Sequence, residues 1–170
     1  MRHGQTELNV KGLLNGAIGD RLTEAGMQQA AEARNILPDT LKAIYSSSLH
    51  RAKQTTEILN ALLQLPVVYS DDLQEVDFGI LNGTPFIEEI KAKHVAMNYY
   101  WHPSGENVDE VKTRVMRALD AIAKDNSDGE VLVVTHGGII RMLHYLQEGE
   151  PLGEIENASL HVFDLDKILG

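Results

Sequence analysis

Cysteine is absent from this chain of 170 residues, which excludes a disulfide framework, a thiolate metal site and a cysteine nucleophile. Long hydrophobic runs are also absent, because every apolar stretch is far shorter than the roughly 20 residues of a membrane-spanning helix. No apolar segment of signal-peptide length follows Met1. These absences favour a cytoplasmic protein that does not enter a membrane.

Basic residues are the minority among the charged ones. Lys and Arg number 15 against 25 Asp and Glu, which gives a formal net charge of −10. Such a surface repels nucleic acid and anionic lipid, so we expect no nucleic-acid partner and no membrane partner. An anionic ligand would have to be small and enter a locally cationic pocket.

Linkers, tandem repeats and low-complexity stretches are lacking too, so we predict one domain over residues 1–170. A chain of this length buries roughly 70% of the surface that it exposes when unfolded, enough to complete a core without a metal or a partner. The residues leave open whether the protein forms a homodimer.

Strand and helix patterns alternate along the chain. We expect helices over residues 23–37, 49–62, 108–122 and 139–146, and strands over residues 43–45, 67–69, 130–135 and 159–165, the last at an edge of the sheet. Thr23 is the expected N-cap of the first helix, and a hydroxyl among residues 46–48 that of the second. The apolar run 131–134 is typical of a strand buried in a parallel sheet. The pattern predicts a three-layer α/β/α fold with a mostly parallel central sheet, which binds ligands at the carboxyl ends of its strands.

Polar residues occupy three positions where a strand ends or the chain begins. They are Arg2 with His3, Arg51 after the strand at 43–45, and His136 after the strand at 130–135. Guanidinium groups match phosphate oxygens in a bidentate fashion, and helix N-termini add backbone N–H donors. If the three positions face one pocket, the predicted ligand is a phosphate.

Five motifs in this order resemble those of the histidine phosphatase superfamily, which includes the cofactor-dependent phosphoglycerate mutases. They are RHGQT at residues 2–6 followed by Asn9, LTEAG at 22–26, SSLHRAKQT at 47–55, LQEVDFG at 73–79 and VTHGGIIR at 134–141. A lone RHG tripeptide would be weak evidence, whereas five ordered motifs that agree with the expected strands and helices are specific. The resemblance covers nearly the whole chain and implies a phosphoglycerate mutase-like fold.

The resemblance also implies roles for individual residues. His3 would attack phosphorus and become a phosphohistidine, and Glu75 would be the general acid that then activates water. The residues implied in binding the phosphate are Arg2, Asn9, Arg51, His136 and Gly137, with His136 counted among the catalytic residues. Because fixed positive charge and positioning dominate phosphoryl transfer, we expect no metal and no other cofactor.

For some residues, a surface or structural role is an alternative to a role in the site. Glu75 lies among other carboxylates, of which Asp77 is the next candidate for the acid, and Asn9 could form a turn instead. The other histidines show no metal-ligand spacing, and we interpret them as structural or surface residues: His50, His94, His102, His144 and His161.

The length of the segment between Glu75 and His136 bears on whether the protein is a phosphatase or a mutase. Only residues 76–135, 60 in number, lie between Glu75 and His136, whereas mutases of this family carry an insertion there that helps to cover the site. A mutase must exclude water, so a short cover favours hydrolysis. We therefore expect a metal-independent histidine acid phosphatase-type hydrolase that acts on small phosphorylated metabolites. The alternatives are a phosphoglycerate mutase and a catalytically silent phospho-ligand binder.

Some positions depart from the family pattern. Asn15 and Arg21 stand where glutamine and proline are usual, and residues 80–83 (ILNG) replace a tryptophan, an acidic residue and a glycine. These changes concern substrate identity more than chemistry. Only Met1 precedes the first motif, where the family has a central strand, so we expect that strand to be truncated. We expect a chain extended by about five to seven apolar residues to be more stable.

Overall fold

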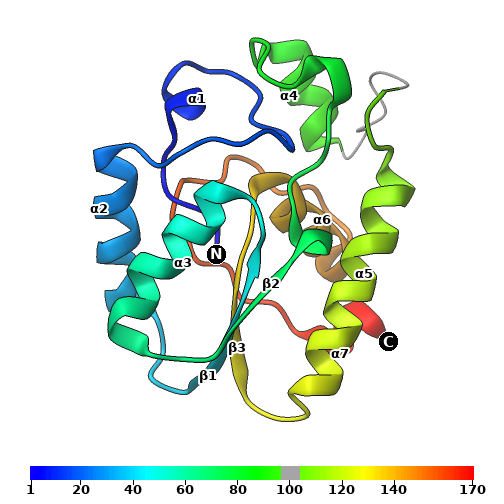
Figure 1. Cartoon of the computed structure of the whole chain (residues 1–170). Helices are drawn as coiled ribbons and strands as arrows, with labels where there is room; N and C mark the ends of the chain where they lie inside the picture. The colour runs from blue at the N-terminus through cyan, green and yellow to red at the C-terminus, as the bar shows by residue number, and fades with distance from the viewer. Residues whose placement is uncertain (97–103) are drawn as a thin grey trace.

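The computed structural model describes residues 1–96 and 104–170, built around a sheet of three parallel strands. β1 (Leu41–Ser47) lies between β2 (Val67–Ser70) and β3 (Glu130–Val134). Ile44 is in register with residues of both neighbouring strands, Val67 and Leu132. The predicted parallel sheet is therefore confirmed, and the carboxyl ends of its strands share one edge (Figure 1).

Helices connect the strands along the chain. The helices in the described ranges are α1 (Glu7–Val10), α2 (Glu24–Ala33), α3 (His50–Leu63), α4 (Glu88–Val95), α5 (Val108–Asp125), α6 (Gly137–Glu148) and α7 (Leu165–Leu169), with short 3₁₀ helices η1 (Arg34–Ile36), η2 (Asp71–Leu73) and η3 (Gly79–Leu81). Every predicted helix is present, with ends that differ from the prediction by a few residues. The largest difference is in α2, which ends at Ala33, four residues before the predicted end at Leu37, and is followed by η1.

Two groups of helices cover the two faces of the sheet (Figure 1). α2 and α3 pack on the face that carries Ile44 and Leu132, while α5, α6 and α7 pack on the face that carries Tyr45 and Val133. Successive strand residues point to opposite faces, so the apolar run of β3 fills both cores. The three-layer α/β/α prediction is confirmed.

Two of the long helices have an N-cap residue whose side chain accepts a hydrogen bond from the first turn. Thr23 accepts a hydrogen bond from the Gly26 N–H (3.0 Å), as predicted, and Asn107 caps α5. The predicted hydroxyl cap of α3 is wrong, because its N-cap is Leu49, which makes no side-chain cap bond. Ser47 Oγ instead accepts from the Leu49 N–H (3.2 Å), one step before the helix begins.

The first residues lie alongside β3. Arg2 and Thr135 form a parallel bridge, and the His3 N–H donates to the Thr135 carbonyl (3.0 Å). On the other side of this segment the Arg2 N–H donates to the Ser159 carbonyl (3.0 Å). These bonds place Arg2 and His3 at the carboxyl edge of the sheet.

The expected last strand over residues 159–165 is wrong. Ser159 reaches Arg2, but residues 160–164 are neither strand nor helix, and Leu165 already begins α7. A strand needs a neighbour to complete its hydrogen bonds. The segment beside it supplies that neighbour only at Arg2 and His3.

Candidate active site

A cavity of about 970 Å³ lies at the carboxyl edge of the sheet. In Figure 1, α1 and α4 lie above this edge. Its lining includes charged and polar side chains together with apolar ones from the two flanking loops: Arg2, His3, Asn9, Asn15, Glu75, Lys91, Arg141, Glu154, Leu13, Phe78 and Phe86. The predicted site residues Arg2, His3, Asn9, Glu75 and Gly137 all line it. Arg51 and His136 are fully buried and adjoin His3.

His3 is held in one orientation by two hydrogen bonds. Its Nδ1 lies 2.7 Å from the Gly4 carbonyl oxygen, which can only accept, so Nδ1 carries the proton. Nε2 therefore has a lone pair, and it accepts from Arg51 Nε (3.2 Å). Burial, then the charges of Arg51 and Arg2, hold the pKa of His3 well below its usual value. The ring is consequently neutral near pH 7, with Nε2 as its basic nitrogen.

Arg51 lies in the first turn of α3 and is fully buried. Its Nη1 and Nη2 donate to the carbonyls of Ile18 (2.9 Å) and Gly16 (2.7 Å). Burial lowers the pKa of Arg51 to about 10, so the side chain stays positively charged at neutral pH. The loop carbonyls thus hold a cation rigidly beside His3 Nε2.

His136 is the N-cap residue of α6. Its ring centroid lies 5.1 Å from that of His3, and its Nε2 is 2.7 Å from Ser47 Oγ. Burial, followed by the charge of Arg51, holds the pKa of His136 well below its usual value. Its Nδ1 is buried and has no hydrogen-bond partner among residues 1–96 and 104–170. The ring therefore has one buried nitrogen, next to His3, whose hydrogen bond is not made by the protein.

Arg2 places a second guanidinium at the cavity. Its Nη1 donates to the Ile155 carbonyl, and its Nε is buried without a hydrogen-bond partner in the part of the chain that the structure describes. Burial is the main cause that lowers the pKa of Arg2, and the charge of Glu75 opposes this shift. An unsatisfied buried donor is costly, which favours an anion next to it.

Glu75 is anchored by two backbone N–H groups. Its carboxylate accepts from Val76 (3.0 Å) and from Gly138 in the first turn of α6 (3.1 Å). A Cβ at Gly138 would overlap this carboxylate, so the second glycine after His136 is needed for the approach. Asp77, the alternative acid, is bound instead by the Gly79 N–H (2.8 Å) and Asn82 Nδ2 (2.6 Å).

Asn9 makes the hydrogen bonds of a turn residue and also lies at the cavity. Its Oδ1 accepts from the Thr6 N–H (3.1 Å) in the capping box of α1 and from Asn157 Nδ2 (3.2 Å). This is the local turn role. The residue also lines the cavity, so its role in binding phosphate stays a prediction.

Sequence reasoning gave no role in the site to four residues that lie at or behind it. Arg114 of α5 donates to the carbonyls of Asp72, Gln74 and Glu75 and is paired with Glu106 (2.7 Å), so it fixes the segment that carries Glu75. The signal was its place between Val111 and Val115 on the border of the apolar face. Arg141 closes the fifth motif and Asn15 departs from the family pattern, but only the folded chain shows that they and Asn157 line the cavity.

The remaining histidines have different environments. His50 is exposed, and His144 and His161 are half-buried. His94 is buried edge-on against Phe78 and Phe86 and lines the cavity, while His102 lies outside the described residues.

Two features bear on metals and membranes. Within residues 1–96 and 104–170, no three His, Cys, Asp or Glu side chains lie together as a metal site would require. No helix in those ranges has the length and apolar character needed to cross a membrane.

A parallel α/β sheet with two buried histidines and two arginines at its carboxyl edge defines the phosphoglycerate mutase-like class of protein. The fold comparison agrees: the crystal structure of phosphoglycerate mutase from Thermus thermophilus superposes with a TM-score of 0.74 at 28% identity, covering 92% of this chain and 86% of that one. The profile of the histidine phosphatase superfamily (branch 1) matches residues 1–168. The chain belongs to this superfamily.

Two other relatives carry phosphatase names. The metal-independent phosphoserine phosphatase of Arabidopsis thaliana is 32% identical over 177 residues, spanning 97% of this chain and 74% of the relative. A mycobacterial glucosyl-3-phosphoglycerate phosphatase, solved in complex with VO3, has a TM-score of 0.81 at 26% identity, covering 93% and 86% of the two chains. These similarities support a phosphatase of the histidine phosphatase superfamily.

Proposed function

We propose that this chain is a metal-independent phosphomonoesterase, a single histidine phosphatase-like domain over residues 1–170 that hydrolyses small phosphorylated metabolites in the cytoplasm through a phosphohistidine. The observation that carries the proposal is the state of His3. Its Nδ1–H is held by the Gly4 carbonyl, and its basic Nε2 faces Arg51 beside a cavity that can hold a small molecule. A neutral imidazole with an oriented lone pair is the nucleophile that phosphoryl transfer needs.

In the first step the lone pair of His3 Nε2 attacks phosphorus, and the bond from phosphorus to the ester oxygen breaks. The Arg51 N–H that donates to Nε2 in the free protein would then donate to a phosphoryl oxygen. Arg2, Asn9, His136 and the N-terminal backbone of α6 at Gly137 would hold the other oxygens. Such preorganised donors stabilise charge on the equatorial oxygens of the transition state.

The leaving alkoxide must gain a proton, and we assign Glu75 to this role. Its carboxylate lines the cavity and is held there by the Gly138 N–H. In the second step the Glu75 carboxylate takes a proton from water, the water oxygen attacks phosphorus, and the N–P bond breaks. His3 regains its lone pair and inorganic phosphate leaves, so the cycle needs no metal or redox partner.

Two alternatives use the same site differently. A phosphoglycerate mutase would return the phosphoryl group to a second substrate oxygen, and a silent binder would stop before the first step. Only 60 residues lie between Glu75 and His136, which is too short for the insertion that covers the site in mutases and so favours water as the acceptor.

Trapping the phosphoenzyme tests the proposal. p-Nitrophenyl phosphate should be hydrolysed, and an acid-labile, base-stable phosphate should be found on His3 after rapid quenching. His3→Ala should lower turnover by about 10⁴-fold or more, and His50→Ala, an exposed histidine of α3, is the control. Wild-type turnover by His3→Ala would show that the mechanism is wrong.

A metabolite screen then separates the activities. Release of inorganic phosphate supports the phosphatase, conversion of 3-phosphoglycerate to its 2-isomer without release supports a mutase, and binding without either supports a silent protein. Phosphoserine is the first metabolite to include, because it appears in the name of the Arabidopsis relative.

A further inference from the structure

One buried hydroxyl contacts the site without lining the cavity. Ser47 is the last residue of β1 and is fully buried, and its Oγ lies 2.7 Å from Nε2 of His136. We propose that Ser47 is a positioning residue: its hydroxyl donates to Nε2 of His136 and so fixes the Nδ1–H tautomer, which offers a proton to the phosphoryl group. This inference rests on the proposed function, because it assumes that His136 binds a phosphoryl oxygen.

The hydrogen bonds of Ser47 define the direction of this contact. Its Oγ accepts from the backbone N–H of Leu49 (3.2 Å). A serine hydroxyl has one proton to donate as well as its lone pairs. Nε2 of His136 is the acceptor within reach, so the hydroxyl is fully used when it donates there.

The protonation state of His136 makes the tautomer matter. Burial and the nearby charge of Arg51 keep the ring neutral at neutral pH, so it carries one proton rather than two. If Nε2 held that proton, Nδ1 would present a lone pair to the phosphate. Two lone pairs would then face each other, and the ring would repel the group that it is meant to bind.

The position of Nδ1 supports the same assignment. It is buried and has no hydrogen-bond partner in residues 1–96 and 104–170, and the ring lies beside the nucleophile His3. Nε2 is already engaged by Ser47, so Nδ1 is the nitrogen left for a ligand. A phosphoryl oxygen has only lone pairs to offer, so Nδ1 must carry the proton.

The strand offers a matched control for Ser47. Ser46 is the preceding residue of β1 and is equally buried, but its Oγ accepts from Thr56 Oγ1 (2.9 Å) and lies 3.0 Å from the Ser47 carbonyl. Among the described residues, it makes no hydrogen bond with His3 or His136. Ser46→Ala therefore removes a comparable buried hydroxyl without changing the partner of His136.

Imidazole nitrogen NMR reads the tautomer directly. In protein labelled with ¹⁵N-histidine, we expect His136 to show a protonated Nδ1 and an unprotonated Nε2 in the wild type and in Ser46→Ala. Ser47→Ala should lose this preference, and Ser47→Thr, which keeps the hydroxyl, should retain it. A wild-type ring protonated at Nε2, or an unchanged pattern in Ser47→Ala, would overturn the proposal.

Kinetics supply the second measurement. With p-nitrophenyl phosphate, Ser47→Ala should lower kcat by about 10- to 100-fold with less change in KM, and Ser47→Thr should restore part of the loss. Ser46→Ala should stay within about threefold of the wild type. Equal losses in Ser46→Ala and Ser47→Ala would show a merely structural role and would also overturn the proposal.

The two measurements keep the inferences separate. The spectra require no turnover, so a protein with the expected tautomer but no hydrolysis would contradict the proposed phosphatase and not the role of Ser47. Because the wild-type spectrum alone can refute the assignment, the test stands even if Ser47→Ala does not fold.

Discussion

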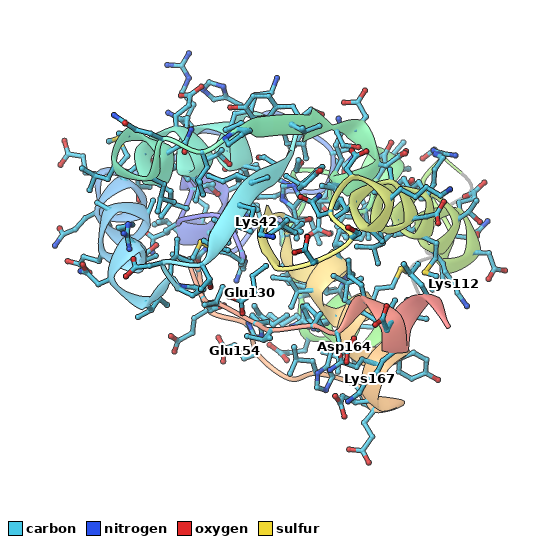
Figure 2. The ribbon with its side chains drawn as sticks, turned by 90° about the horizontal axis from the view of Figure 1, so that it is seen from below. Lys42, Lys112, Glu130, Glu154, Asp164 and Lys167 are labelled. Atoms are coloured by element: carbon cyan, nitrogen blue, oxygen red, sulfur yellow. The ribbon has the colours of Figure 1, made fainter. Side chains whose placement is uncertain are left out.

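Charged side chains are exposed to solvent at one end of the central sheet and buried at the other. At the amino ends, seen from below in Figure 2, Lys42 and Glu130 lie near the start of β1 and β3. Lys42 pairs with Asp128 (3.1 Å) in solvent, with about half of its side chain exposed. At the carboxyl ends, Arg51 is fully buried and is bound by the carbonyls of Gly16 and Ile18.

This difference explains where chemistry can occur. Water screens the exposed pair, which consequently contributes little to stability or to any ligand. A buried guanidinium gives up its hydration, so it needs fixed acceptors, and it then acts strongly on a ligand placed beside it. Desolvation of the guanidinium is therefore unfavourable at the carboxyl end, but it creates a rigid cationic pocket there. The exposed pair at the amino end has no such cost and forms no pocket.

Among the tests of this comparison, the largest expected effect comes from removing the buried cation. Arg51→Met should lower p-nitrophenyl phosphate turnover by about 10³-fold, because it removes the donor at the nucleophile and the charge that faces the phosphoryl oxygens. Lys42→Met removes a cation of the same sheet at its other end and should leave turnover unchanged. Thermal melts confirm that both variants fold, and equal losses in the two would contradict the comparison.

The next effect depends on the leaving group. Glu75→Gln should slow hydrolysis of alkyl phosphates by about 10²-fold and affect p-nitrophenyl phosphate far less, since a nitrophenolate leaves without a proton. The ratio of kcat/KM for the two substrates is the measurement. Equal losses would move the acid elsewhere. Asp77→Asn is the matched control. The Asp77 carboxylate is already bound by the Gly79 N–H and Asn82 Nδ2, so this variant should not change the ratio.

A smaller effect concerns stability and pH. Burial, together with the charges of Arg141 and Arg2, lowers the pKa of His94 to about 3, against 6.5 for an unfolded chain. The unfolded state therefore takes up a proton first as pH falls below 6.5, and the stabilisation present above this pH is lost. This one residue should account for about 2 kcal/mol of the loss between pH 7.5 and 5.

Urea denaturation of His94→Leu tests this linkage. The variant should lose less unfolding free energy than the wild type over the same pH interval. Parallel pH curves for the two proteins would show that His94 is protonated in the folded state. The remaining pH dependence is expected to include His3 and His136, whose pKa values are also lowered.

The smallest expected effect is none. Activity should survive EDTA, because arginine and histidine donors supply the positive environment that a metal would otherwise provide. Turnover is measured before and after dialysis against the chelator. Complete loss that magnesium or manganese restores would contradict this expectation.

Much of the fold could be predicted because its signals are local. The hydrophobic pattern of residues 131–134 predicts a buried parallel strand, and Thr23 caps α2 as its position predicts. The expected strand over residues 159–165 is wrong because strand formation depends on a neighbour, which no local pattern reveals. The predicted hydroxyl cap of α3 is also wrong. The hydroxyl of Ser47 contacts His136, which is distant in the sequence, and no local pattern reveals that contact.

The sequence by itself predicted the family from its ordered motifs and the order of the layers from its periodicity, and the resemblance nominated the residues of the proposed site. Only the tertiary structure decided how they act. It brought Arg51 to Nε2 of His3, held that guanidinium with two loop carbonyls, and brought Arg114 behind Glu75. Hydrogen-bond direction and desolvation arise from contacts between distant segments, so they exist only once the chain has folded.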